Sequence, residues 1–337
     1  MSEIRRLLAR LPNWLGDALL ARPLLHALRA SWPEAEIVAV APAALLELLA
    51  TDRVFDRPEP WPADRPARRA LLQRLRRWRP DAALVLPPSF SSAYFAWRTG
   101  APVRAGYAHD ARSILLTHAL RRGARGDLHL SREFLRLGEI LGASSTQLPP
   151  LRPTEESLRS ARALLDRHGL APGEPYAILA PRSAWGPARE WPAVRFAAAG
   201  RGLATRGCRV VVCGTAGERD SCAAVAEAVG TAACSVAGET DLPELAALCA
   251  GAALAVCNDS GVAHLAAAVG TPTVQLYGSA SSAWTHALGP RAEVIHRPPV
   301  CSPCYQRTCR IGYACLTAVE VAHVLQVCDG LANMRAA

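Results

Sequence analysis

Strand-like and helix-like segments alternate along almost the whole chain, and this alternation restricts the fold more than any other feature. Apolar, β-rich runs occur at 37–41, 82–86, 176–180, 209–213, 252–257 and 273–277. Helical patterns lie between them at 18–30, 67–78, 130–141, 155–168, 193–206, 219–229 and 242–251. Strands that alternate with helices form parallel sheets with both faces covered. The sequence therefore predicts an α/β fold.

The chain of 337 residues is long enough for two domains. A region rich in proline and glycine, 148–175, surrounds one helix and is typical of a junction between domains. We expect a first domain at 1–155, a second at 156–318, and a final helix in 319–337 that packs back on the first domain. Ligands in such sheets bind beyond the carboxyl ends of the strands, so we expect them between the two domains.

Half of the residues are apolar and a fifth are charged, as in globular proteins. No apolar stretch is long enough to span a membrane, and the first residues lack the pattern of a signal peptide, which predicts a cytoplasmic protein. Residues 1–150 hold 22 arginines against 14 acidic residues, a net charge of +8 within a total of +9. This asymmetry favours an anionic partner, either a membrane surface or a phosphorylated substrate. Nucleic acid is not expected, because no nucleic-acid-binding motif accompanies the charge.

The segment VCNDSGVAHLAAAVGTPTVQLYG at 256–278 is the richest in chemical signals. A strand ends at Asn258, a polar loop follows, and a helix begins near Gly261. The unpaired N–H groups of such a helix suit phosphate, and glycine lets a ligand approach the backbone. Asp259 or Ser260 could equally be a helix cap. An ordinary capped joint and a phosphate site both fit this loop.

Three further loops carry polar side chains after strand-like runs. In PNWLGDALLARP, Asp17 is either a first-turn carboxylate or a general base. In APRSAWGPAREWP, Ser183 and Arg189 could form a second anion site. In VVVCGTAGERD, Glu218 is either a solvated side chain or a partner for ribose hydroxyls. The GTAGE loop lacks the GxGxxG spacing of dehydrogenases.

Taken in order, these motifs resemble glycosyltransferase family 9, the ADP-heptose:lipopolysaccharide heptosyltransferases, and among them the heptosyltransferase II group. The similarity also includes VLPPSFSSAYFAWRTGAPVRAGY at 85–107 and CSPCYQRTCRIGYACL at 301–316. It implies a GT-B fold, in which two Rossmann-like domains face each other across a cleft. It also implies inverting transfer of a heptose from ADP-heptose to the inner core of lipopolysaccharide.

The resemblance also implies roles for single residues. Asp17 takes the position of the family's general base, and Arg189 stands where the family usually has lysine. The positions matched to the donor site are Ser183, Arg189, Glu218, Thr240, Leu242, Asp259, Ser260, Gly261 and His264. Within this set, Glu218 falls at the ribose, and Thr240 and Leu242 fall near the adenine. Because Asp259 would repel phosphate, we expect it to hold heptose hydroxyls or loop N–H groups.

Four of the eleven cysteines form a C-x2-C-x4-C-x5-C pattern: Cys301, Cys304, Cys309 and Cys315. This spacing suits a structural zinc ion, or a disulfide on oxidation. No Asp-x-Asp pair is placed like a catalytic metal site, so we expect no obligatory cofactor.

The resemblance implies a phosphorylated lipid A–Kdo–heptose acceptor, and with it a salt-sensitive, peripheral association with the inner face of the inner membrane. Three alternatives share the architecture. They are a family 9 transferase for another nucleotide sugar, a sugar-nucleotide epimerase, and a non-catalytic protein that binds sugar nucleotides.

Overall fold

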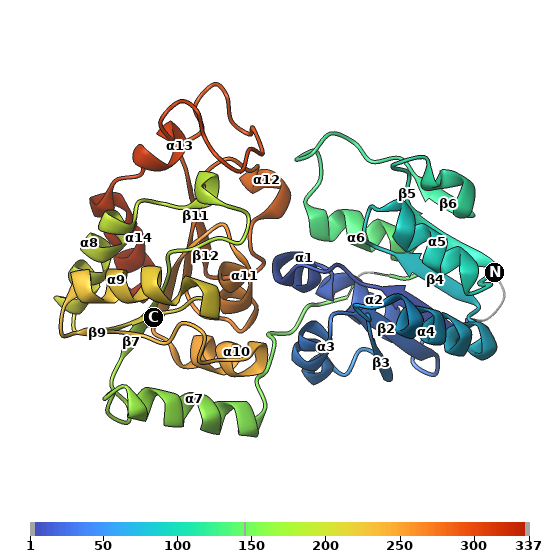
Figure 1. Cartoon of the computed structure of the whole chain (residues 1–337), viewed down its shortest axis with the longest axis horizontal. Coiled ribbons are helices and arrows are strands. Elements are labelled where there is room, and N and C mark those ends of the chain that lie inside the picture. The colour runs from blue at the N-terminus through green and yellow to red at the C-terminus, as the bar shows by residue number, and fades with distance from the viewer. Residues whose placement is uncertain (1–3, 145, 334–337) are drawn as a thin grey trace. The chain divides into compact units, whose positions relative to one another are not determined.

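The computed structural model describes residues 4–144 and 146–333 (Figure 1). The chain divides into two compact units, residues 1–149 and 150–337. The expected boundary at residue 155 coincides with the first residue of helix α7 (Glu155–Arg167), in the second unit. Each unit contains one six-stranded sheet.

In the first unit, all neighbouring strands are parallel and follow the order β3-β2-β1-β4-β5-β6. The strands are β1 (Arg6–Arg10), β2 (Glu36–Ala41), β3 (Arg57–Pro60), β4 (Ala82–Val85), β5 (Val103–Tyr107) and β6 (His118–Leu120). Central β1 pairs Leu8 with Val38 on one side and with Ala83 on the other. The strand order reverses between β1 and β4, and such switch points are where parallel sheets bind ligands.

The helices of the first unit cover both faces of this sheet. They are α1 (Leu15–Leu20), α2 (Arg22–Ser31), α3 (Ala43–Leu49), α4 (Arg65–Trp78), α5 (Phe90–Arg98) and α6 (Leu130–Glu139), with short 3₁₀ turns η1 (Ala50–Asp52) and η2 (Arg112–Leu115). α4 and α5 bury Leu71, Leu75 and Phe95 in one cluster with Leu8, so they cover the same face. α2 packs against α6.

The second unit repeats this plan, with parallel strands in the order β12-β11-β10-β7-β8-β9. The strands are β7 (Tyr176–Ala180), β8 (Arg209–Val212), β9 (Ala233–Ser235), β10 (Leu254–Asn258), β11 (Thr273–Tyr277) and β12 (Ala292–His296). All residues of β7, β10 and β11 are buried, as expected for central strands of a covered sheet. Here the order reverses between β7 and β10.

The remaining helices cover this second sheet. They are α8 (Ala193–Ala204), α9 (Arg219–Val229), α10 (Leu242–Gly251), α11 (Gly261–Ala268), α12 (Ser282–Thr285), α13 (Ala314–Thr317) and α14 (Val321–Asn333), with 3₁₀ turns η3 (Pro187–Arg189) and η4 (Ala216–Glu218). The final helix, α14, packs against α8, β10 and β11 within the second unit. Its Val324 and Cys328 share a buried cluster with Trp191 and Phe196.

The predicted α/β fold with parallel sheets is confirmed. Among the described helices, none is both long and apolar enough to cross a bilayer.

Candidate functional site

The polar loops of the second unit gather at its switch point. β7 and β10 are neighbouring parallel strands, with Ala180 opposite Cys257 in the register. Their carboxyl ends therefore lie side by side, and so do the loops that follow them. One loop carries Ser183 and Arg189, and the other carries Asp259 and Ser260. The structure thus brings together two segments that are about seventy residues apart in sequence.

Asn258 ties these two loops to each other. Its side chain is fully buried at the end of β10. Its Oδ1 accepts the N–H of Trp191 at 2.9 Å, and its Nδ2 donates to the carbonyl of Pro181 at 2.8 Å. Both ends of the β7 loop are therefore held by one amide. The sequence analysis did not assign this role, because an asparagine before Asp-Ser-Gly is typical of any turn.

Asp259 and Arg189 form an ion pair inside the site. Oδ2 of Asp259 lies 3.0 Å from Nη1 of Arg189, and the carboxylate side chain is only 3% exposed. Burial raises the pKa of Asp259 to about 6, while Arg189 and the hydroxyl of Tyr277 act in the opposite direction. A carboxyl group with this pKa is a hydrogen-bond partner for neutral hydroxyls. It is also a counter-ion that keeps Arg189 in place.

Ser183 is a buried residue of the β7 loop that bonds to the β10 loop. Its hydroxyl donates to the main-chain carbonyl of Asp259 at 3.2 Å, and its N–H donates to Oε1 of Glu190 at 3.0 Å. Glu190 in turn pairs with Arg182 at 2.7 Å. Arg182 therefore contributes to the scaffold of this loop.

The start of α11 supplies further polar groups. Ser260 occupies the N-cap position, but its side chain makes no capping bond, and its buried hydroxyl has no hydrogen-bond partner among the described residues. Gly261 is the first helical residue, and His264 is buried one turn later. A helix start with unused N–H groups and a spare hydroxyl is chemically suited to an anion. The sequence allowed either an ordinary capped joint or a phosphate site, and in the structure the Ser260 side chain does not cap the helix.

Glu218, Thr240 and Leu242 lie at the same edge of the sheet, after the carboxyl ends of β8 and β9. Oε2 of Glu218 accepts from the N–H of Thr215 at 2.7 Å and from its hydroxyl at 2.9 Å. This carboxylate therefore stabilises its own loop. Leu242 is the first residue of α10, and Thr240 is half-buried just before the capping residue of that helix.

The C-terminal loop adds residues that sequence reasoning missed. The guanidinium carbons of Arg189 and Arg307 lie 4.7 and 5.4 Å from the ring centroid of Trp185. The main-chain carbonyl of Arg307 accepts the N–H of Ala188 at 3.0 Å, and Trp185 Nε1 donates to Gln306 at 3.2 Å. Arg307 lies within the CSPCYQRTCR motif, but no local pattern links that motif to the β7 loop.

The three cysteines of that motif and Cys315 line one small cavity of about 20 Å³. All four are free of disulfides. The Sγ of Cys309 accepts the N–H groups of Ile311 and Tyr313 at 3.4 and 3.3 Å. Across the described ranges, however, no three cysteine, histidine or acidic side chains are arranged to hold a metal ion.

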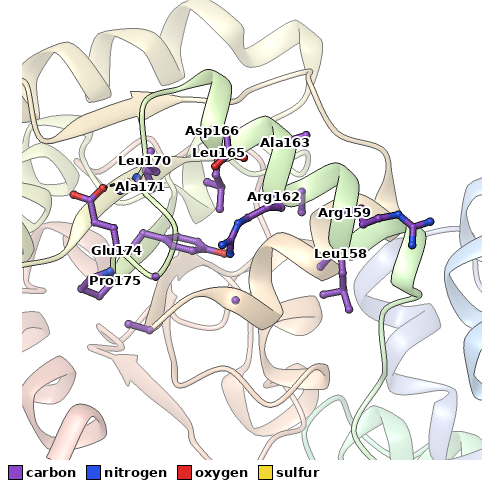
Figure 2. Close-up of a pocket in the computed structure, with 16 residues that line it drawn as sticks. Leu158, Arg159, Arg162, Ala163, Leu165, Asp166, Leu170, Ala171, Glu174 and Pro175 are labelled. Atoms are coloured by element: carbon purple, nitrogen blue, oxygen red, sulfur yellow. Dashed lines mark hydrogen bonds between the residues drawn. The ribbon is translucent and has the colours of Figure 1, made fainter.

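A larger cavity of about 760 Å³ lies elsewhere in the second unit, lined by α7 and the segment that precedes β7 (Figure 2). Arg159, Arg162 and Glu174 are among its lining residues. Two of its lining residues place it at the amino ends of β7 and β10: Tyr176 is the first residue of β7, and Ala253 directly precedes β10. Because ligands of parallel sheets bind at carboxyl ends, this cavity is not the candidate site.

In the first unit, Asp17 follows central β1 at that sheet's switch point. It lies in the first turn of α1, where the N-cap residue is Trp14. Buried Arg10 holds the loop, because its Nη2 donates to Oδ1 of Asn13 at 2.7 Å and its Nη1 donates to the carbonyls of Val40 and Leu11. Asp17 is therefore a first-turn carboxylate, and this placement is compatible with both sequence interpretations.

Comparison with known proteins identifies relatives over most of the chain. The model of glycosyltransferase family 9 (heptosyltransferase) matches residues 68–314. The chain is 31% identical over 298 residues to lipopolysaccharide heptosyltransferase 2 of Escherichia coli K12, an alignment that covers 84% of this chain and 86% of that protein. The predicted resemblance to heptosyltransferase II is confirmed.

Solved structures show the same architecture. The structure of the E. coli ADP-heptose lipopolysaccharide heptosyltransferase II matches 98% of this chain and 100% of its own, with a TM-score of 0.83 and 27% identity. A family 9 glycosyltransferase from Veillonella parvula matches 99% of both chains, with a TM-score of 0.85 and 23% identity. The expected GT-B class is therefore confirmed.

Proposed function

Because the chain belongs to glycosyltransferase family 9, we propose that it transfers heptose from ADP-heptose to the inner core of lipopolysaccharide, with inversion at the anomeric carbon. The enzyme class follows from the family. The choice of donor is supported by the ADP-heptose transferase of E. coli, which this chain matches over 98% of its length.

One observation carries the proposal for the donor. At the switch point of the second unit, the hydroxyl of Ser260, which has no partner in the described part of the chain, lies at the start of α11, next to the loop that bears Arg189. In our proposal, the helix N–H groups and Arg189 bind the diphosphate and stabilise the charge that develops as ADP departs. Ser183, Gly261 and His264 complete this binding surface.

The other donor contacts follow the same edge of the sheet. We assign Glu218 to the ribose hydroxyls, and Thr240 and Leu242 to the surroundings of the adenine. Asp259 binds heptose hydroxyls, because a carboxylate would repel the phosphate oxygens but can accept hydrogen bonds from hydroxyl groups.

Asp17 acts as the general base in this proposal. Its carboxylate takes the proton from an acceptor hydroxyl while that oxygen forms a bond to the anomeric carbon of heptose. The bond from this carbon to the β-phosphate oxygen breaks, and the electron pair leaves with ADP. Proton transfer by a positioned carboxylate typically accelerates such a step by about 10²- to 10⁴-fold.

The proposed acceptor is a phosphorylated lipid A–Kdo–heptose molecule, and the net charge of +8 in residues 1–150 supports an anionic partner. The protein would then be cytoplasmic and bound peripherally to the inner face of the inner membrane. We propose no obligatory cofactor. Zinc at Cys301, Cys304, Cys309 and Cys315 would be structural, and elemental analysis of protein purified without added metal tests it.

A transfer assay with a defined acceptor tests the function. Purified protein is incubated with ADP-heptose or other nucleotide sugars, with and without a truncated core acceptor, and the product linkage is determined. We expect heptose transfer only with ADP-heptose and acceptor, and an inverted linkage. Faster transfer of another sugar would contradict the donor assignment. Conversion of the donor without acceptor would identify an epimerase, and binding without any transfer would identify a non-catalytic protein.

A further inference from the structure

The outer face of α5 is aromatic and exposed. Phe90, Tyr94 and Trp97 are 44%, 41% and 46% exposed, although large aromatic side chains are usually mostly buried. Their spacing of four and three residues places them in one row along the helix. The opposite face of α5 packs Ala93, Phe95 and Ala96 into the core. The aromatic row is therefore not needed to hold the helix on the sheet.

The neighbouring helix, α4, presents uncompensated positive charge. Arg65, Arg69, Arg76 and Arg77 are exposed, and in the described part of the chain none of them forms an ion pair with an acidic side chain. By contrast, Arg74 on the same helix pairs with Glu59 at 2.8 Å. Arginines without acidic partners on one helix face favour an anionic partner.

These two surfaces belong to one face of the first unit. α4 and α5 contact each other and bury side chains in the same cluster on one side of the sheet; Figure 1 labels both helices. η2 also packs against α5, and its Ile114 is 83% exposed. We call this surface the α4–α5 face and define it by Arg65, Arg69, Arg76, Arg77, Phe90, Tyr94, Trp97 and Ile114.

We propose that the α4–α5 face docks on an anionic lipid surface. Tyrosine and tryptophan favour the level of the lipid headgroups, and an exposed isoleucine contributes apolar area there. Arginines near such a surface are attracted to anionic headgroups. The aromatic row on α5 and the arginines on α4 supply both contributions from adjacent helices.

The geometry of the rings favours lipid over single-stranded nucleic acid. Phe90 and Tyr94 are stacked on each other, with planes 14° apart and centroids separated by 6.5 Å. The guanidinium of Arg98 lies over the Tyr94 ring, and Trp97 is 5.7 Å from Tyr94. Base stacking needs open ring faces. Here Phe90, Trp97 and Arg98 all lie against the Tyr94 ring, whereas insertion at a lipid interface needs only exposed apolar edges.

The biological sense of this docking rests on the proposed function, because a lipid-linked acceptor would be presented at such a surface. Its test does not. Full-length protein is mixed with vesicles of phosphatidylcholine, or of equimolar phosphatidylcholine and phosphatidylglycerol, and binding is measured by flotation. We expect binding to the anionic vesicles alone, weakened at about 0.5 M salt by screening.

Two sets of substitutions test the face itself. The first, Arg69→Gln with Arg76→Gln and Arg77→Gln, should weaken binding at least about tenfold, because each arginine near the surface contributes. The matched control changes three exposed arginines on α7 of the second unit: Arg159→Gln, Arg162→Gln and Arg167→Gln. This control removes the same charge and should bind within about twofold of wild type if only the α4–α5 face docks.

The second set, Tyr94→Gln with Trp97→Gln, should also weaken binding about tenfold while the circular dichroism spectrum stays unchanged. The control for apolar area is Val194→Gln, since Val194 is 76% exposed on α8. Equal losses in the control variants would overturn the proposal. So would wild-type binding to neutral vesicles at full strength, or tighter binding to single-stranded RNA than to anionic vesicles.

Transfer to a soluble core oligosaccharide separates this proposal from the proposed function. We expect both α4–α5 variants to use the soluble acceptor at the wild-type rate and to lose activity only on acceptor embedded in vesicles. Full activity of the wild-type protein on the soluble acceptor, without any binding of the wild type to anionic vesicles, would overturn the docking surface alone. Vesicle binding without any transfer would overturn the proposed function alone.

Discussion

The loops after central strands β10 and β1 differ in how firmly their own units hold them. After β10, Asn258 and Asp259 are buried, and the Asn258 amide bonds to main-chain groups on both sides of the β7 loop. After β1, Asn13 and Trp14 are exposed, and the side chain of Asn13 accepts a hydrogen bond from buried Arg10. One loop is a buried polar network, and the other is an exposed turn.

This difference agrees with two different tasks. A buried, pre-formed network suits a ligand whose charge and shape never vary, such as a diphosphate, because little reorganisation is needed on binding. An exposed turn that ends in the first-turn carboxylate of Asp17 suits a group that must meet a bulky acceptor and take one proton. We therefore expect mutations in the two loops to have effects of different kinds.

The largest expected effect comes from Asp17→Asn. The amide keeps the size of the carboxylate but cannot take a proton, so we expect kcat to fall about 10³-fold. The measurement is the steady-state rate of heptose transfer at saturating acceptor. The control is Asn13→Ala, in the same loop, which should keep kcat within about threefold. If Asp17→Asn turned over at the wild-type rate, Asp17 would not be the general base.

Asn258→Ala should have the next largest effect, this time on stability. The change leaves the N–H of Trp191 and the carbonyl of Pro181 buried without their partner, which costs about 4 kcal/mol in the free energy of unfolding. In the first unit, Asn13→Ala removes one partly exposed hydrogen bond and should cost about 1 kcal/mol. Denaturant unfolding measures both, and equal costs would contradict the contrast between the loops.

Asp259→Asn should have a smaller effect that depends on pH. The pKa of Asp259 is about 6 in the folded protein and 3.8 for the free carboxyl group, so between these values the folded state binds more protons than the unfolded state. Stability contributed by this group is therefore lost as pH rises from about 4 to 6, by at most about 3 kcal/mol. Because asparagine does not titrate, Asp259→Asn should not show this pH-dependent loss of stability.

The measurement is Tm between pH 4 and pH 7, without ligand. Wild type should show a decline of several degrees that Asp259→Asn lacks. Asp220→Asn, an exposed first-turn residue of α9, serves as the control and should follow wild type. Identical pH profiles for wild type and Asp259→Asn would show that Asp259 ionises normally in the folded protein.

The sequence revealed those parts of the fold in which local pattern and tertiary structure agree. Buried central strands such as β7, β10 and β11 appeared as apolar runs, and helices such as α8, α9 and α10 appeared by their periodicity. Ser183, Arg189, Asp259 and Ser260 could be proposed from the sequence because each follows a predicted strand, whereas His264 was proposed only from the family resemblance. The predicted single helix at 18–30 was wrong, because the helix ends at Leu20 and α2 begins anew with Pro23 in its first turn.

Other elements could not be found from pattern alone. Edge strands β3, β6 and β9 have only three or four residues, and β3 contains two prolines, so their strand character comes from pairing with a neighbour. α5 was missed because its aromatic residues favour strands, and its burial is decided by the sheet beneath it. The Arg189–Asp259 pair and the roles of Asn258 and Arg10 depend on the register between distant segments.

The measurement that tests the account most directly is ADP affinity, determined by titration calorimetry in two variants. If the second unit holds the leaving group and Asp17 only takes the proton, Arg189→Met should weaken ADP binding at least about tenfold. Asp17→Asn should bind ADP within about twofold of wild type while transferring heptose about 10³-fold more slowly. Loss of ADP binding in Asp17→Asn, or unchanged binding in Arg189→Met, would contradict the account.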